Sequence, residues 1–257
     1  MKTKVSHSLF LLALVCSASC RAESAFVTVF VDARTEARIG PFPFDRSITA
    51  NAIGMFERLG AKGVVLKFFL DQPKGPGDDA LVTAMKKFPT VLQARCDDTE
   101  PKSNILEKRF STPADTKTTY AVSCNAGWIP LQVLQKNAVE VCFIDQPVAD
   151  LAPLRERYQG RAVKTLYSCA LELARKFVPQ PDASGKRKID LRKAPRFDAI
   201  SLIDVLDGKA NRADFTGKIV VFGYDGSKST MFDTAIGKLS AHRVFLANLL
   251  ILELGEN

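Results

Sequence analysis

Histidine is scarce in this sequence, and the motifs of familiar metal, hydrolase and nucleotide sites are missing from it. Of the two histidines, only His242 lies beyond residue 22. The cysteines form no C-x-x-C pair, so no structural zinc site is predicted. There is no G-x-S-x-G motif, and residues 223–229 lack the Gly-Lys-Ser order of a phosphate-binding loop. We therefore predict no cofactor, no metal and no enzyme; a periplasmic hydrolase is the less favoured alternative.

Long apolar runs are also missing. No segment beyond the N-terminus reaches the ~18 consecutive apolar residues of a membrane-spanning helix. The N-terminus has the pattern of a secretion signal instead: Lys2 and Lys4 precede an apolar stretch at 9–15 and small residues at 17–19. Cleavage after Ala22 leaves a single domain, residues 23–257, which we expect to be periplasmic or otherwise extracytoplasmic.

Cys20 leaves a second interpretation of the signal open. The segment ending Ser17-Ala18-Ser19-Cys20 resembles a bacterial lipobox, in which the cysteine is acylated and becomes the new N-terminus. Lipoboxes prefer an aliphatic residue where Ser17 stands. In this interpretation the signal ends before Cys20, and a lipid anchor is the protein's attachment to the membrane.

Four cysteines remain beyond the signal, at Cys96, Cys124, Cys142 and Cys169. An even number in an oxidising compartment favours disulfides. Four cysteines can pair in several ways, which the sequence leaves open. We favour Cys142 with Cys169, because one lies on a predicted strand and the other on the helix that follows, and therefore Cys96 with Cys124.

Basic residues are in excess and give the chain a formal net charge of +8. Many of them form one cluster: Lys186, Arg187, Lys188, Arg192, Lys193 and Arg196. Such a cluster can mark a polyanion site. Turn-forming residues at 179–185 precede it, however, and indicate a solvated loop. Nucleic acid is also a poor partner for an exported protein, so none is predicted.

Hydrophobic periodicity predicts alternating strands and helices. A β-branched and aromatic run ends at Asp32, an amphipathic helix begins near Ser47 and ends at Gly60, and an apolar run follows. Strand, helix and strand in succession imply a right-handed crossover between parallel strands. Further strands are predicted at 90–94, 139–144 and 218–223, and helices at 163–177 and 240–254. The fold class is α/β, with a mainly parallel central sheet flanked by helices in a three-layer sandwich.

Several of these pieces occur in the order typical of the CHASE type-two family, the extracytoplasmic sensory domains of bacterial signalling proteins. The sequence resembles that family over most of the chain beyond the signal. The matching pieces are Asp32, the segment from Gly40 to Arg46, Leu59-Gly60-Ala61, the run from Val64 to Leu70, Asp78-Asp79, Gly217 to Gly223, and Asp233. Three departures are clear. Lys67 stands where the family usually has an aspartate, and Thr234-Ala235 replaces a Thr-Pro pair. The Asp-Gly segment followed by arginine in the middle of the family is not recognisable around Asp145 to Arg155.

The resemblance implies a sensory role without catalysis. We expect the domain to detect a small molecule or a periplasmic condition and to pass that state to a membrane-bound signalling protein, because it resembles a stand-alone family member. A different class of function is a structural or protein-interaction module of the cell envelope. In that alternative the apolar helix at 240–254 supplies the binding surface.

The candidate ligand-binding residues lie mainly at strand ends and in the loops that follow. Ligands of open α/β sheets bind beyond the carboxyl ends of the strands. There, a carboxylate and a guanidinium could bind a zwitterionic or anionic molecule; alternatively, Asp32 and Arg46 hold their loop together. Together with the positions that the resemblance supplies, the predicted set is Asp32, Arg46, Lys67, Asp79, Asp225 and Asp233.

Lys67 is the most unusual of these residues. It interrupts the apolar run from Val64 to Leu70, and an ammonium group inside such a strand costs several kcal/mol unless it is paired. Our hypothesis is that Lys67 lies against Asp32 on the neighbouring strand. The alternative is that its side chain extends to an exposed edge of the sheet.

Overall fold

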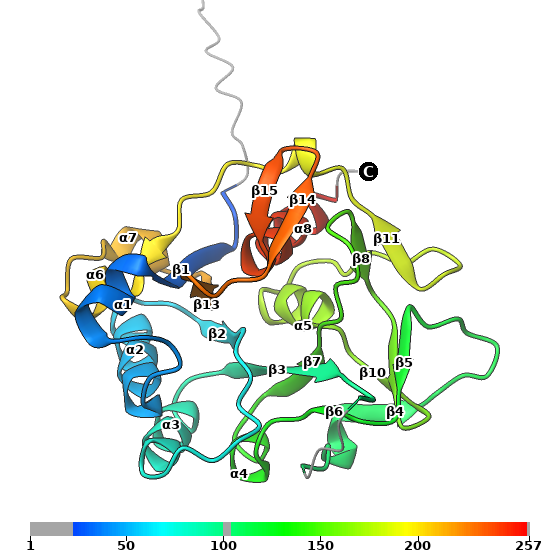
Figure 1. The fold of residues 1–257 in the computed structure, drawn as a ribbon, viewed down its shortest axis with the longest axis horizontal. Helices are drawn as coiled ribbons and strands as arrows, with labels where there is room; N and C mark the ends of the chain where they lie inside the picture. Colours follow the sequence, from blue (N-terminus) through cyan, green and yellow to red (C-terminus); the bar gives the residue numbers. More distant parts are fainter. Residues whose placement is uncertain (1–22, 100–103, 256–257) are drawn as a thin grey trace, which may run out of the picture.

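One large sheet occupies the centre of the chain (Figure 1). This computed structural model describes residues 23–99 and 104–255, so the predicted secretion signal and Cys20 lie outside the described residues. Among these, seven strands form the sheet in the order β12, β1, β13, β2, β3 and β6, with β7 also paired to β3. Their bounds are β1 (Phe26–Asp32), β2 (Gly63–Leu66), β3 (Thr90–Cys96), β6 (Gly127–Trp128), β7 (Glu140–Phe143), β12 (Ile200–Ser201) and β13 (Ile219–Asp225).

Three small sheets surround the large one in the described part of the chain. The first contains β4 (Ser111–Pro113), β10 (Arg161–Val163), β9 (Glu156–Tyr158) and β5 (Val122–Cys124). The second pairs β11 (Lys186–Lys188) with β8 (Leu151–Pro153), and the third is the hairpin of β14 (Met231–Thr234) and β15 (Gly237–Ser240).

The prediction of an α/β fold is confirmed, but the large sheet is mixed rather than mainly parallel. Strands β12, β1, β13, β2, β3 and β7 pair in parallel, whereas β6 runs antiparallel to β3. The small sheets add further antiparallel ladders. All eight of their strands have only three or four residues, which is too short for the alternating pattern that identifies a strand in a sequence.

The strand order also differs from the simplest interpretation of the sequence. Strands β1 and β2 were expected to be neighbours because they flank one crossover. Instead β13 lies between them, with Val29 opposite Phe222 on one side and Leu66 opposite Phe222 on the other. The predicted contact between Asp32 and Lys67 is therefore wrong, since a whole strand separates them.

Helices cover both faces of the sheet (Figure 1). On β1 the side chains of Val27, Val29 and Val31 join one apolar cluster and those of Phe26 and Phe30 join the other, as the alternation of a strand requires. Helices α2 (Arg46–Arg58), α3 (Gly77–Met85), α6 (Leu202–Leu206) and α7 (Arg212–Phe215) pack on the first face, and α5 (Leu166–Leu173) and α8 (Ala241–Leu254) on the second. The remaining helices are α1 (Ala33–Ile39), α4 (Gln132–Gln135), η1 (Lys108–Phe110) and η2 (Leu191–Lys193).

Two disulfides join the pairs that the sequence favoured. Cys96 at the end of β3 is bonded to Cys124 on β5, with Cα atoms 5.7 Å apart. Cys142 on β7 is bonded to Cys169 on α5, with Cα atoms 6.5 Å apart. Both bonds therefore link the β3–β7 half of the sheet to its surroundings.

Helix α8 lies in the core and not on the surface. Its residues from Val244 to Leu252 are all buried, so little of its apolar surface is left for a partner. Within residues 23–99 and 104–255, no helix has the length and hydropathy needed to cross a bilayer.

Candidate functional site

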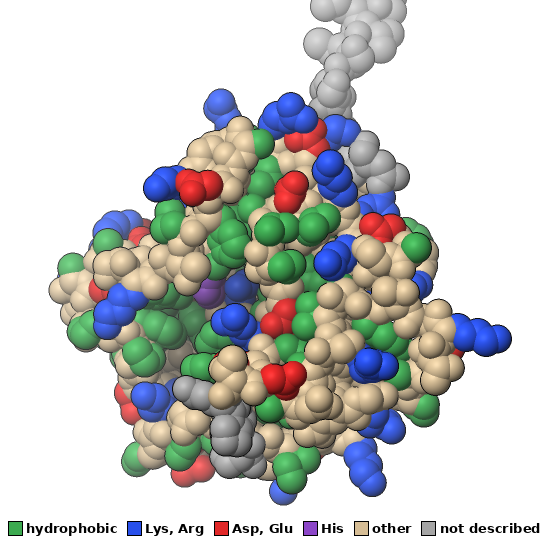
Figure 2. Space-filling view, turned by 45° about the vertical axis from the view of Figure 1, so that its right-hand side comes forward, with side chains coloured by type: hydrophobic (Ala, Val, Ile, Leu, Met, Phe, Trp, Pro, Cys, Tyr) green, Lys and Arg blue, Asp and Glu red, His purple; other side chains and the backbone are tan. Residues whose placement is uncertain are grey.

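A cavity of about 590 Å³ lies at the carboxyl ends of β2, β3, β7 and β13. We call it the strand-end cavity. Its aromatic lining consists of Phe42, Phe68, Phe69, Tyr224, Phe232 and Phe245. Its charged and amide lining includes Lys67, Gln93, Arg95, Asp145, Gln146, Lys228 and His242. Figure 2 shows a hollow in this face with hydrophobic walls and with basic and imidazole side chains in it. Its size and place are those of a small-molecule site in an α/β fold.

Lys67 is the first residue beyond β2, and its backbone N–H donates to the Phe222 carbonyl at 2.9 Å. The residue is only 7% exposed, and its Nζ atom lies 5.2 Å from the centre of the Phe245 ring. Its ammonium group makes no ion pair or hydrogen bond with any described residue. Burial, and then the charge of Arg95, lowers the pKa of Lys67 from 10.5 to about 7. The predicted escape to an exposed sheet edge is also wrong, because β2 is an inner strand.

His242 lies in the first turn of α8, against β13. Its Nδ1 atom accepts a hydrogen bond from the Tyr224 backbone N–H at 3.0 Å, so in the neutral ring the proton is on Nε2. Burial, and then the charge of Lys67, lowers the pKa of His242 well below its usual value. A side chain at Gly223 would place its Cβ 2.5 Å from Nδ1. Glycine at that position is therefore what lets the imidazole approach the strand.

Two residues of β3 contribute polar groups to the cavity. Gln93 is buried, and its Oε1 atom has no hydrogen-bond partner in the described structure. Arg95 lies two residues further along the same face, and its Nε atom is 3.7 Å from the Asp145 carboxylate. The Arg95 side chain is 55% exposed, so this ion pair is weak and its guanidinium is free to move.

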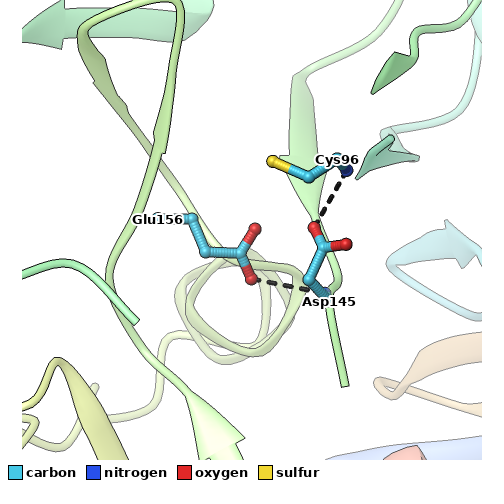
Figure 3. A group of neighbouring side chains, drawn as sticks. All are labelled: Cys96, Asp145 and Glu156. Atoms are coloured by element: carbon cyan, nitrogen blue, oxygen red, sulfur yellow. Dashed lines mark hydrogen bonds between the residues drawn. The ribbon is translucent and has the colours of Figure 1, made fainter. Parts of the chain in front are cut away.

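The half-buried Asp145 lies beside the fully buried Glu156 (Figure 3). Its carboxylate accepts from the Cys96 N–H at 3.0 Å, and its own N–H donates to Glu156 at 3.3 Å. Burial, and then the neighbouring Asp145, raises the pKa of Glu156 well above its usual value. Burial also raises the pKa of Asp145. Both shifts favour the protonated form of the pair, and the larger shift is that of Glu156.

The same three residues form the one group in the described structure with the proximity of a metal site. The donor set does not suit an ion, because Cys96 is bonded to Cys124 and offers no thiolate. The raised pKa of Glu156 likewise favours a proton over a metal at this place.

Arg46 and Asp32 have local structural partners. The buried Arg46 guanidinium contacts Asp78 at 2.5 Å and the Gln72 carbonyl at 2.6 Å, which matches the alternative that it holds its loop together. The Asp32 carboxylate caps α1 by accepting from the Thr35 N–H at 2.9 Å, and it also accepts from the Ser201 hydroxyl. Neither residue lines the strand-end cavity.

The other predicted residues are also dispersed. Asp225 accepts from Arg243 and Ser240, both at 2.6 Å. Asp79 is exposed in the first turn of α3, and the side chain of Asp233 is 88% exposed on β14. Of the predicted set, Lys67 alone lines the strand-end cavity.

Several lining residues escaped prediction from the sequence. Arg95 and Asp145 follow predicted strands directly, so their places at strand ends were a usable signal. His242 gave none, because its position depends on how the first turn of α8 packs against β13. Gln93 likewise carried no pattern that separates it from an ordinary strand residue.

Comparisons with known proteins identify one family. A family model described as the CHASE2 domain matches residues 8–251, nearly the whole chain. No curated protein and no solved structure matches the chain.

Proposed function

The chain belongs to the CHASE2 family, whose members are extracytoplasmic sensory domains found in signalling proteins, and on this premise we propose that it senses a small molecule bound in the strand-end cavity. The observation that carries the proposal is the cavity itself. It has the volume of a small-molecule site and lies where the parallel strands end.

The elements around this cavity are far apart in the sequence. Its lining comes from the segments after β2 and β7, from β3, and from α8 with the loop that precedes β14. A ligand that contacts all of these favours the conformation in which they are close together. Binding can transmit a signal only through such a difference in affinity between two conformations.

We propose further that the domain is not catalytic. All four cysteines in the described residues are oxidised, which removes the thiol nucleophiles there. The Nδ1 atom of His242 accepts from a backbone N–H, so no acid orients this imidazole as in a catalytic triad. The hydrolase alternative therefore lacks a supporting arrangement at this site.

The proposed partner is a membrane-bound signalling protein, as the family's role in signalling suggests. The two disulfides suit an extracytoplasmic location. Acylation of Cys20 would hold the domain close to such a partner.

The test is a thermal unfolding screen of the exported protein against a panel of small metabolites. We expect at least one compound to raise the midpoint of the wild-type protein, because a ligand of the folded state stabilises it by mass action. Ala241→Trp, which fills the cavity from α8, abolishes that shift. Ala213→Trp, on the exposed surface of α7, preserves it. The proposal would be contradicted if no compound raised the unfolding midpoint, or if every such rise persisted in Ala241→Trp.

A further inference from the structure

We propose that the ligand of the strand-end cavity is a small organic anion, whose carboxylate lies against Lys67 and whose apolar body lies between the aromatic walls. This inference rests on the proposed function, because it names the class of molecule that the same cavity binds. Three observations support it: buried polar groups without partners, an excess of positive charge around them, and an aromatic lining.

Two polar side chains in this cavity lack partners. Lys67 and Gln93 are each more than nine-tenths buried, and neither side chain forms a hydrogen bond or an ion pair with a described residue. Buried polar groups are nearly always satisfied, and each exception needs an explanation. A ligand carboxylate that accepts from the Lys67 ammonium supplies the first missing partner, and a hydroxyl or N–H of the same ligand that donates to Gln93 Oε1 would supply the second.

The charges in the lining favour an anion. Lys67, Arg95 and Lys228 carry positive charge, against the single carboxylate of Asp145. That carboxylate is engaged by the Cys96 N–H and lies beside Arg95, so no lining carboxylate contacts Lys67. These positive charges would repel a cationic ligand, whereas a ligand carboxylate would be attracted to them and would pair with the Lys67 ammonium.

The apolar part of the ligand follows from the walls. Phe42 lies between Phe68 and Tyr224, with ring centres 5.1 and 4.9 Å away, and Phe245 lies beneath the Lys67 ammonium. An aromatic ring or a branched aliphatic group can pack against these faces. His242 adds a directed donor, because its Nδ1 is occupied by the Tyr224 N–H and its Nε2 carries the proton.

An NMR titration of the exported protein tests this inference, with the Gln93 side-chain amide as a reporter. The probes are benzoate, benzamide and benzylamine, which share a ring and carry a negative, a neutral and a positive group. At pH 6.5 we expect benzoate to bind at least about tenfold more tightly than either of the others, because a charge-assisted hydrogen bond distinguishes it. Equal affinity for benzamide, tighter binding of benzylamine, or no benzoate binding overturns the inference.

Two substitutions on the same segment serve as a matched pair. Lys67→Met weakens benzoate binding by at least about tenfold and removes the preference over benzamide, whereas Lys62→Met, at the opposite end of β2, leaves both unchanged. Unaltered benzoate binding in folded Lys67→Met protein overturns the inference. Inorganic phosphate is the last probe: if it displaces benzoate at equal concentration, the apolar body contributes nothing and that half of the inference fails.

Failure here and failure of the proposed function are distinguishable. If a neutral or cationic metabolite raises the unfolding midpoint and Ala241→Trp abolishes this rise, the ligand is not an anion, but the cavity is still a sensory site. A panel and probes without any binding that Ala241→Trp abolishes refute both.

Discussion

Lys67→Met should stabilise the unliganded protein, and the size of the effect follows from the pKa of the lysine. The pKa falls from 10.5 to about 7 in the folded state. Each pKa unit corresponds to about 1.4 kcal/mol, so a charged Lys67 costs the folded state up to roughly 5 kcal/mol. Methionine has a similar shape and no charge, and it removes this cost.

The sign of the pH dependence follows from the same shift. Below about pH 7 both the folded and the unfolded chain carry the proton on Lys67, and the whole cost is present. Between about 7 and 10.5 the folded protein has lost this proton and the unfolded chain retains it, so the wild-type free energy of unfolding rises with pH. The advantage of Lys67→Met is therefore largest near pH 6 and shrinks towards pH 10.

Urea unfolding near pH 6 and near pH 9.5, with the disulfides intact, measures both quantities. We expect a gain of a few kcal/mol near pH 6 and a much smaller one near pH 9.5, with Lys62→Met as the control that shows neither. A loss of stability near pH 6, or a difference that does not change with pH, would refute the description of Lys67 as a buried lysine without a counter-ion.

Three further substitutions test other parts of the structure. Glu156→Gln replaces an ionisable carboxyl by a neutral amide. Because the pKa of Glu156 is raised in the folded state, wild-type stability falls as the pH rises through that pKa. By urea unfolding we expect equal stability near pH 4 and a more stable variant near pH 8. Arg46→Met leaves the buried Asp78 without its ion pair, which should lower the free energy of unfolding by roughly 3–5 kcal/mol. The affinity for benzoate should not change. Weaker benzoate binding at unchanged stability would show instead that Arg46 binds the ligand. Gly223→Ala forces His242 away from Tyr224, and the lost hydrogen bond should lower the free energy of unfolding by roughly 1–3 kcal/mol. Nitrogen NMR of the imidazole should show the loss of the fixed Nε2–H tautomer, and an unchanged tautomer contradicts this account.

The elements with long, regular patterns could be predicted from the sequence. The buried run ending at Asp32 is β1, and the helix expected from Ser47 to Gly60 is α2, from Arg46 to Arg58. The disulfide pairing followed from placing Cys142 on a strand and Cys169 on the helix after it. In each case the information lies within a few neighbouring residues.

Strand order and the composition of the site could not be predicted in this way. Nothing near β1 or β2 indicates that β13, from the far end of the chain, inserts between them. That insertion removes Asp32 from the reach of Lys67 and places α8, with His242, at the cavity instead. Carboxylates such as Asp225 looked available because their partners, here Arg243 and Ser240, are recognised only in three dimensions.

The positions of the two covalent cross-links make the walls of the cavity unequal. Cys96 and Cys142 fasten β3 and β7 to β5 and α5, so the wall that carries Gln93 and Arg95 is held in place. The opposite wall, formed by the loop before β14 and the first turn of α8, has no such fastening in the described structure. We therefore expect a bound ligand to displace the loop before β14 and the β14–β15 hairpin, while the disulfide-linked wall of β3 and β7 stays in place. The conformational response would then be transmitted to a partner from β14 and β15.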